Sequence, residues 1–349
     1  MRLRNLISAG LGLAIAVGLA AAPAQAQPQT WKVQTSMVAG DFYYKMLQDH
    51  WLDRLAAMTN GQIKIELTPI GSVVPHTETM NAIGQGILQG DFTSTTYFAG
   101  RDKVFALMGD LIAGYDTPMQ LTMFCYHGGG REILQEAFDR YTGGTVQVVG
   151  CGAVAKEAFV SKVHIKGLAD MKGKKIRSPE GLAAEVFRRA GASPVAMPPS
   201  ETYTALDKGV VDAADNSSYT MDKSSGMHKV AKFPIYPGIH SMPIIQFTVN
   251  KAIWNKLSPE LKKAVDAWYV AAIYDMTMRN EMEDRLNVAA DLADKASGIT
   301  IVDWSQADRD AFRAIAAGAW KDFAEGSPLA KKAYDANIAF MQKMGLLAK

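Results

Sequence analysis

The sequence predicts an α/β protein made of two lobes. In the first half of the chain, short apolar or alternating segments take turns with segments of helical spacing. This βαβαβ rhythm with short connections is typical of a parallel-type sheet covered by helices on both faces. Residues 27–349 are too many for one hydrophobic core of common size, which favours two lobes. The last third is almost entirely helical, and one of its helices is long enough to cross both lobes.

The chain begins with a segment that we set aside from the fold. Arg2 and Arg4 form a positively charged start, residues 6–22 are uncharged and mostly apolar, and an A-Q-A sequence completes a small-x-small cleavage site. The pattern predicts a cleaved signal peptide over residues 1–26 and export to a bacterial periplasm. The alternative is a retained membrane anchor, but the run is at the short limit for spanning a bilayer and is rich in Gly and Ala. The residue directly after the cleavage site is not a Cys, which argues against a lipid anchor.

The region before residue 150 is expected to alternate strands and helices. The expected strands cover residues 31–36, 62–67, 92–96 and 145–149. The expected helices cover residues 41–58, 78–88 and 131–141. Glycines close several of these segments, as expected where a helix ends and the chain turns.

The region after residue 150 continues this rhythm and then becomes helical. Strands are expected at residues 159–162, 175–177, 244–249 and 299–302, and helices at residues 182–190 and 201–208. Ser258 caps a further helix with Pro259 at its first position, and neither Gly nor Pro follows until Gly298. A helix of that extent would be about 60 Å long, enough to cross more than one lobe. Residues 305–308 open another helix.

Charge balance and motif content exclude several function classes. The chain has 37 Lys and Arg against 35 Asp and Glu, and two of the Arg residues lie in the leader, so the exported part is neutral. A neutral chain without a basic block is not expected to bind nucleic acid or an anionic membrane. The six His show no HxxxH or HExxH spacing, and neither a GxSxG elbow nor a GxxxxGK(S/T) phosphate loop occurs. We therefore expect no enzymatic activity, no cofactor and no metal held by a known motif.

The two cysteines, Cys125 and Cys151, leave two interpretations open. In an oxidising compartment they can form a disulfide that closes a moderate loop. They can equally be two buried, unpaired thiols. Neither lies in a CxxC motif or beside a His, which argues against metal or thiol chemistry.

Arg177 is the sharpest candidate for a binding residue. It is expected at the end of a strand, directly before a helix in which Ser178 is the cap and Pro179 takes the first position. Ligands of open α/β sheets bind beyond the carboxyl ends of strands, and a guanidinium can hold a carboxylate through two parallel hydrogen bonds. A carboxylate or another small anion is therefore the expected ligand. The alternative is a surface Arg paired with Glu180 or Asp170.

Two further places carry polar side chains that suit a ligand. Asp215 and Asn216 follow the next strand, and Asn216 can donate to a ligand oxygen or accept from one. The alternative there is ordinary turn chemistry, which Asn and Ser favour. Lys156 lies in an apolar stretch, either as a second anion ligand or as half of an ion pair.

Aromatic and amphipathic residues near expected loops are suited to the walls of a small pocket. They are Tyr97, Phe98, Tyr236 and His240. The alternative is that they fill the core, which is the commoner place for such residues.

Residues 167–216 carry the most specific motif of the chain. They include GLADMKGKKIRSPEG and then AGASPVAMPPSETYTALDKGVVDAADN. This resembles the pattern dLkGlKiR, followed by sE.YtALq.GvvDgaen, in the solute-binding proteins of TRAP (tripartite ATP-independent periplasmic) transporters. The resemblance continues through V-A-K-F at residues 230–233 and through His240. The length, the leader and the long late helix agree as well, so it covers essentially the whole exported chain.

The resemblance implies a two-lobed fold like that of periplasmic binding proteins, with mixed sheets, crossing strands and a long helix that spans both lobes. The ligand would lie between the lobes. Lobe I is expected to contain residues 27–150 and about 240–280. Lobe II is expected to contain residues 151–239 and about 281–349, including the C-terminal helices.

The resemblance also implies roles for individual residues. Arg177 corresponds to the Arg that fixes the ligand carboxylate. Dicarboxylate-binding members have a second Arg where this chain has Lys156, and this departure weakens the case for a C4-dicarboxylate. Keto-acid-binding members carry Glu-Trp and hold a cation with the ligand, whereas this chain has Asp215-Asn216. The family's Glu-Asn pair after the GvvD strand appears here as Asp215-Asn216, so Asn216 is expected as a ligand contact. Asp215 leaves cation-assisted binding open. The Tyr-Pro-Gly-x-His run at residues 236–240 resembles both groups of members, so His240 is expected as a further pocket residue.

We expect a periplasmic receptor, monomeric or homodimeric, that captures a small organic acid and delivers it to a membrane-embedded TRAP permease. One alternative is an exported hydrolase or lyase that processes a carboxylate, for which the adjacent His240 and Ser241 are the nearest hint. The other is a ligand-sensing subunit of a signalling system, which the sequence does not distinguish from a transport receptor. The sequence does not identify the organic acid.

Overall fold

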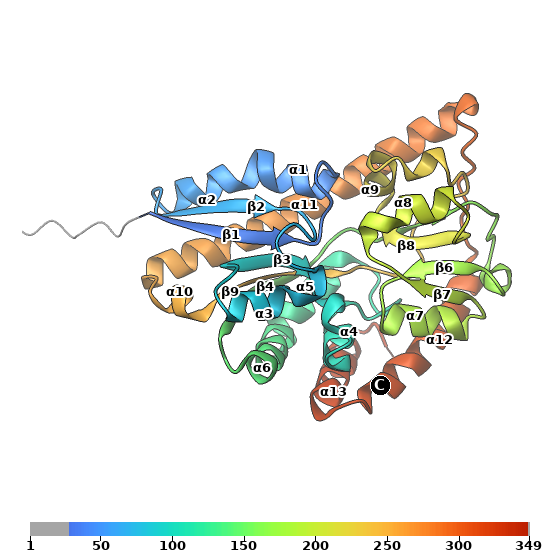
Figure 1. Ribbon diagram of the computed structural model, residues 1–349. Coiled ribbons are helices and arrows are strands. Elements are labelled where there is room, and N and C mark those ends of the chain that lie inside the picture. The colour runs from blue at the N-terminus through green and yellow to red at the C-terminus, as the bar shows by residue number, and fades with distance from the viewer. Residues whose placement is uncertain (1–27, 348–349) are drawn as a thin grey trace, which may run out of the picture.

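The α/β prediction is confirmed, because the structure contains two sheets flanked by helices, one in each of two lobes (Figure 1). It is a computed structural model that describes residues 28–347. The predicted leader, residues 1–26, lies outside the described residues. In the described range, no helix combines the length and the apolar character needed to cross a membrane.

The first sheet has five strands in the order β2-β1-β3-β9-β4. The strands are β1 (Gln29–Thr35), β2 (Ile63–Thr68), β3 (Gly90–Ser94), β4 (Val146–Ala153) and β9 (Ile244–Asn250). β1 runs parallel to β2 and β3, whereas β9 runs antiparallel to both of its neighbours. The sheet is therefore mixed, since a late strand inserts between β3 and β4. Six of the seven β9 residues are buried, which explains the continuous apolar run in its sequence.

The second sheet has four strands in the order β5-β8-β6-β7. The strands are β5 (Ala158–Ser161), β6 (Lys175–Ser178), β7 (Ser193–Ala196) and β8 (Ala213–Ser217). β6 is parallel to β7 and β8, and β5 is antiparallel to β8. Because β6 and β8 are parallel neighbours, their carboxyl ends lie at the same edge. Arg177 pairs with Ala214 in register and therefore lies beside Asp215.

Helices cover both sheets. Those of the first sheet are α1 (Phe42–Met46), α2 (Leu52–Met58), α3 (Thr79–Gly84), α4 (Lys103–Gly109), α5 (Pro118–His127), α6 (Gly130–Thr142) and α10 (Lys251–Asn255). Those of the second sheet are α7 (Leu182–Arg189), α8 (Pro199–Asp207) and α9 (Tyr219–Ser224). A π-helical turn, η1 (Leu47–Trp51), joins α1 to α2, so the helix predicted at residues 41–58 is one continuous element.

One long helix, α11 (Pro259–Ala293), spans the two lobes. It contacts α2 and β4 in the first lobe and α9 in the second, and Figure 1 shows it running behind both. Ser258 accepts a hydrogen bond from the backbone of Leu261 and so caps it, as predicted. Its 35 residues correspond to about 52 Å, and it ends before Gly298 because Asp294 caps a short 3-10 turn instead.

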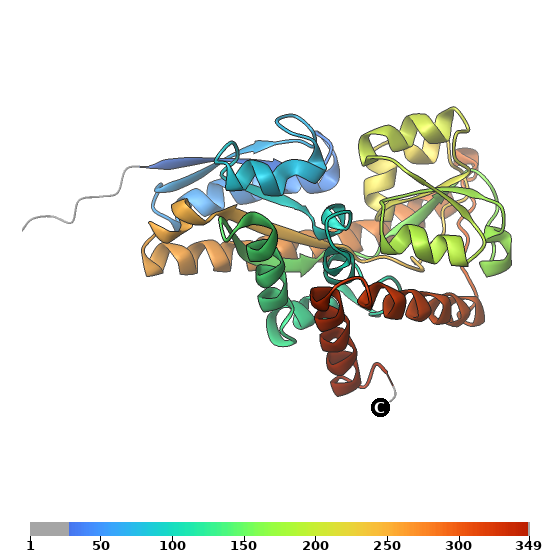
Figure 2. The ribbon, with the colours of Figure 1, turned by 60° about the horizontal axis from the view of Figure 1, so that its bottom comes forward.

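The last two helices contact both lobes. α12 (Gln306–Ala324) packs against α7 and α4, and α13 (Pro328–Lys343) packs against α4 and α6. Figure 2 shows α12, in red, running along the second lobe to the middle of the molecule, where α13, in dark red, turns downward. We therefore propose that α13 belongs with lobe I rather than lobe II. The rest of the division into lobes stands as a proposal.

The structure answers one question that the sequence left open and corrects one prediction. Cys125 on α5 and Cys151 on β4 form a disulfide, which resolves the alternative of unpaired thiols. The strand predicted at residues 299–302 is wrong as an extended element, because only Val302 forms a bridge, with Ile235. That bridge still holds the segment after α11 to the region where the chain crosses between the lobes.

Candidate functional site

A cavity of about 320 Å³ lies between the two lobes. The first lobe contributes residues 36–41 after β1 and residues 94–97 at the end of β3, and the second contributes the carboxyl ends of β6 and β8. Its titratable lining residues are Asp41, Tyr43, Tyr97, Asp110, Glu157, Arg177, Tyr203 and Asp215. Arg177 is the only cationic side chain among the described residues that line the cavity. The cavity therefore offers one positive group to a ligand, surrounded by carboxyls and phenols.

Arg177 is held rigidly at the carboxyl end of β6. Only 2% of the residue is exposed, and its Nε and Nη2 donate to the carbonyl oxygen of Met197 at 3.1 and 3.0 Å. Its Nη1 donates to the carbonyl oxygen of Asp215 at 2.5 Å. Since a guanidinium has five N–H groups, these bonds leave one N–H on each terminal nitrogen. That pair can hold a carboxylate through two hydrogen bonds.

The local structure around Arg177 differs from the prediction in one respect. Gly181, with a φ of +106°, is the N-cap of α7, so Ser178 and Pro179 are not its cap and first residue. Ser178 ends β6 instead, and its hydroxyl donates to the carbonyl of Pro179. The alternative of a surface ion pair is also wrong, because Arg177 is buried and bonds to carbonyl oxygens.

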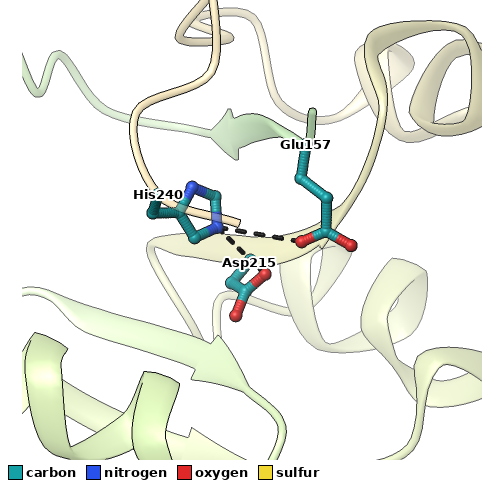
Figure 3. A group of neighbouring side chains, drawn as sticks. All are labelled: Glu157, Asp215 and His240. Atoms are coloured by element: carbon teal, nitrogen blue, oxygen red, sulfur yellow. Dashed lines mark hydrogen bonds and ion pairs between the residues drawn. The ribbon is translucent and has the colours of Figure 1, made fainter. Parts of the chain in front are cut away.

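Three buried groups lie close together: Glu157, Asp215 and His240 (Figure 3). Glu157 lies between β4 and β5, Asp215 is on β8, and His240 lies in the segment that leads to β9. His240 Nε2 is 3.0 Å from Asp215 Oδ1 and 3.8 Å from Glu157 Oε2. The three ligand atoms lie within 4.8 Å of one another.

The two carboxyls of this cluster have opposite protonation preferences. Burial favours the neutral form of Asp215, but His240, Glu157 and Arg177 stabilise the carboxylate and lower its pKa to about 2. Burial raises the pKa of Glu157 well above its usual range, and the neighbouring charge of Asp215 adds to the rise. Glu157 is therefore the protonated member of the pair and Asp215 the ionised one. The proton of Glu157 thus supplies positive charge at the position that a bound cation would occupy.

Asp110 is a further buried carboxyl in the cavity wall. It accepts hydrogen bonds from the hydroxyl of Ser241 and from the backbone N–H of Met242. Burial raises its pKa to about 7, against the lowering effect of Ser241 and of the charge of His240. Sequence reasoning missed Asp110, although a lone acid inside the apolar run FALMGDLIAG is the kind of signal that could have found it.

The structure brings several of the predicted site residues to the cavity. Arg177, Asp215, Asn216 and Tyr97 line it. Asn216 lies within β8 rather than in a loop after it, and its Nδ2 donates to Asp222 Oδ1 at 2.7 Å. Burial raises the pKa of Tyr97, and the charge of Arg177 together with a hydrogen bond from it lowers that pKa in part.

Three other predicted residues do not reach the cavity wall. Phe98 packs in the core against Phe105 and Phe138, as the alternative for this residue expected. Lys156 is not a lining residue; its neighbour Glu157 is, because adjacent residues of an extended segment face opposite sides. His240 lies one layer deeper and acts on the cavity through Asp215.

The cluster of Glu157, Asp215 and His240 has the composition of a cation site. Carboxylate oxygens are the ligands that hard cations such as Na⁺ and Ca²⁺ prefer. All three residues are buried, and the two carboxyls line the cavity where a ligand oxygen could complete the coordination. The two carboxyls therefore fit a hard cation, provided that Glu157 gives up its proton, whereas the imidazole of His240 is not a preferred ligand of such an ion.

Comparisons with known proteins show which family and which relatives this chain resembles. Residues 34–326 match the family model described as "Bacterial extracellular solute-binding protein, family 7" (DctP). A monocarboxylate 2-oxoacid-binding periplasmic protein of Nostoc sp. is 30% identical over 292 residues, which cover 83% of this chain and 78% of that protein.

Solved structures show the same fold. A TRAP periplasmic solute-binding protein of Rhodobacter sphaeroides, in an apo open state, is 39% identical with a TM-score of 0.74, covering 92% of this chain and all of the other. A TRAP periplasmic solute-binding protein of Pseudoalteromonas atlantica, with bound sodium and pyruvate, has a TM-score of 0.78. It is 22% identical and covers 92% of this chain and 96% of that one, so this likeness concerns the fold.

Proposed function

This chain belongs to family 7 of the bacterial extracellular solute-binding proteins, the DctP family, and we propose that Arg177 anchors the carboxylate of its ligand. Its function is that of a TRAP-type solute receptor, whose role in the family is to deliver a small carboxylate to a membrane permease. The observation that carries the anchor is the buried guanidinium with one N–H on each terminal nitrogen that no backbone carbonyl accepts, in a cavity between two lobes.

The ligand we propose is a small organic acid with one carboxylate. Arg177 supplies the one positive charge in the described cavity wall, so a second carboxylate would face Asp110, Glu157 and Asp215 without a partner. The 2-oxoacid specificity in the name of the Nostoc relative, and the pyruvate bound to the Pseudoalteromonas protein, support a monocarboxylate. Tyr97 and Asn216 are the proposed polar contacts beside the anchor.

We also propose that a hard cation accompanies the ligand. Calcium or sodium is bound together with a carboxylate ligand in three solute-binding proteins of the same fold. In this chain Asp215 and Glu157 would hold the ion, and His240 would keep Asp215 ionised. The bound ion would neutralise the carboxyls of the wall and polarise a ligand oxygen.

The fold and the family are those of receptors, and the proposed absence of turnover follows from the local geometry. The hydrolase alternative needs His240 to activate Ser241. However, Ser241 donates to Asp110, while His240 contacts Asp215 and Glu157. The Ser241 hydroxyl therefore donates to a carboxyl and not to His240. A sensing subunit remains the second candidate, and a permease gene beside this one, rather than a histidine kinase gene, would favour transport.

The periplasmic location follows from the family, and the cleaved leader over residues 1–26 is part of the proposal. We propose that the lobes close on the ligand, so that the permease meets a different surface of the loaded receptor. A thermal-melting screen over monocarboxylates, dicarboxylates and neutral analogues, with and without Ca²⁺, tests the function. A native-state ligand raises the melting temperature with concentration. Stabilisation by neutral analogues alone would contradict it.

A further inference from the structure

Asn216 and Asp222 form a hydrogen-bonded pair beside the cavity. Asn216 lies near the end of β8 and lines the cavity, and Asp222 lies on α9 and is fully buried. Asn216 Nδ2 donates to Asp222 Oδ1 at 2.7 Å. The other two polar atoms of the pair, Asn216 Oδ1 and Asp222 Oδ2, are buried and have no hydrogen-bond partner among the described residues. Buried polar atoms are normally bonded, so these two oxygens point to a missing donor.

A single proton on Asp222 gives both oxygens a partner. A protonated carboxyl donates through its O–H and accepts through its other oxygen, whereas a carboxylate only accepts. If Asp222 Oδ2 carries the proton and donates it to Asn216 Oδ1, the two planar groups form the cyclic pair of a carboxylic acid and a primary amide. An ionised Asp222 would instead be a buried charge with one hydrogen bond, which is costly.

A second buried carboxyl, Asp284 on α11, shows the contrast. Its Oδ1 accepts hydrogen bonds from the backbone N–H of Thr220 at 2.7 Å and from Nδ2 of Asn280 at 2.9 Å. These two donors support a negative charge on Asp284, whereas Asp222 has one donor. Burial raises the pKa of Asp222 well above its usual range, against the hydrogen bond from Asn216, and the charge of Asp284 adds to the rise. Asp222 is therefore the neutral member of the two carboxyls.

The cyclic pair decides which group Asn216 offers to a ligand. An amide nitrogen carries two N–H groups, and the ring uses one of them together with the amide oxygen. The second N–H points away from the ring. Because Asn216 lines the cavity, this N–H is the group that faces a ligand. Without the ring the amide could turn and present its oxygen, which would repel a carboxylate.

We propose that Asp222 is a positioning residue, a neutral acid that forms a cyclic pair with Asn216 and thereby makes Asn216 a hydrogen-bond donor to the ligand. This role rests on the proposed function, in which Asn216 contacts the ligand beside Arg177. It also narrows the class of ligand. The acid must present an oxygen that accepts a hydrogen bond from Asn216, such as a second carboxylate oxygen or a 2-oxo group.

Calorimetric titration of a double-mutant cycle with pyruvate tests this role. Asn216→Ala should weaken binding about tenfold, the effect of losing one hydrogen bond to a charged ligand. Asp222→Ala should weaken it by a similar factor, and the double variant by no more than Asn216→Ala alone, because Asp222 acts through Asn216. Asp222→Asn, whose amide can rebuild the ring, should recover most of the affinity that Asp222→Ala loses. Additive losses, or an Asp222→Asn protein as weak as Asp222→Ala, would overturn the proposal.

Asp291 provides a matched control for a purely structural effect on α9. This buried residue of α11 accepts hydrogen bonds from the hydroxyl of Tyr219 at 2.7 Å and from Lys223 Nζ at 2.8 Å, so it holds α9 without bonding to the pair. Asp291→Ala should lower the melting temperature and leave the affinity for pyruvate unchanged. A loss of affinity equal to that of Asp222→Ala would mean that Asp222 only holds α9 in place.

Infrared spectroscopy of the ligand-free protein tests the proton separately from ligand binding. At neutral pH the difference spectrum of the wild type minus Asp222→Asn should contain the carbonyl band of a protonated carboxyl. A carboxylate band in its place would overturn the proposal. A wild type that binds none of pyruvate, 2-oxobutyrate and lactate would contradict the proposed function instead, and the infrared band would still decide whether Asp222 is the neutral partner of Asn216.

Discussion

Arg177 Nη1 donates to the backbone carbonyl of Asp215 at 2.5 Å, so the proposed ligand anchor is tied to the strand that carries the neighbouring carboxylate. The bond exists because β6 and β8 are parallel neighbours and end at the same edge. The backbone of Asp215 orients the guanidinium, while its side chain turns toward His240. One strand end thus places a positive and a negative group side by side.

Replacing Arg177 with Lys should abolish tight carboxylate binding. An ammonium cannot bridge the Met197 and Asp215 carbonyls and still present two parallel N–H groups. We expect a loss of more than about 100-fold in affinity, the cost of breaking a buried hydrogen-bonded charge pair. Calorimetric titration measures it. Tyr97→Phe, which removes one hydroxyl beside the anchor, should cost less, and an Arg177→Lys protein that binds as well as the wild type would remove Arg177 from the anchor role.

Replacing Glu157 with Gln should remove cation dependence while keeping the shape of the site. The wild type should gain thermal stability from Ca²⁺ in the presence of a bound acid, and more so at higher pH, because the cation must displace the proton that the raised pKa holds on Glu157. The variant should lose most of this gain. Lys156→Gln is the matched neighbour and should behave like the wild type, since Lys156 does not line the cavity. A Ca²⁺ effect that is lost in Lys156→Gln and kept in Glu157→Gln would contradict the assignment of Glu157 to the cation site.

Asp110 should make folding stability fall as the pH rises toward neutrality. Its pKa is about 7 in the folded protein against 3.8 in a free side chain, so the folded state holds the proton more tightly. That stabilisation is complete below about pH 4 and is lost as the pH passes through 7, amounting to about 4 kcal/mol at most. Urea unfolding between pH 4 and 8 should show a shallower decline for Asp110→Asn. An equal change in the exposed Asp335→Asn control would refute this assignment.

Removing the disulfide should destabilise the first lobe. Cys125 and Cys151 are 26 residues apart in sequence, and the cross-link restricts the unfolded chain. For a loop of this size the expected loss in the free energy of unfolding is about 3 kcal/mol. Urea unfolding of Cys125→Ser/Cys151→Ser against the wild type measures it. Dithiothreitol should destabilise the wild type and leave the double variant unchanged.

The sequence predicted the place of Arg177 at the end of a strand because that prediction rests on local patterns. A strand followed by a turn and a helix places Arg177 at a sheet edge whatever the rest of the chain does. Lys156 and Glu157 show the limit: a one-residue difference decides which side chain faces the cavity, and long-range contacts such as that of the Glu157 backbone with Ser241 fix that choice. Phe98 was ambiguous for the same reason, since an aromatic after a strand can face a pocket or a core.

Long-range pairing was beyond the reach of local patterns. The apolar run of β9 predicted a buried strand but not its antiparallel insertion between β3 and β4. Asp110 approaches the site only because the chain returns with Ser241 more than a hundred residues later. The cap of α7 shifted to Gly181 because a left-handed turn after Pro179, which Gly tolerates, competes with the Ser-Pro start.

The most direct test of the central claim is calorimetric titration with matched acids and amides. Pyruvate, 2-oxobutyrate and lactate are each compared with the corresponding primary carboxamide, which keeps the size and shape but removes the negative charge. If Arg177 holds a carboxylate, at least one acid should bind with a stoichiometry of one, and its amide should bind more than about 100-fold more weakly. An amide that binds as tightly as its acid would contradict the account.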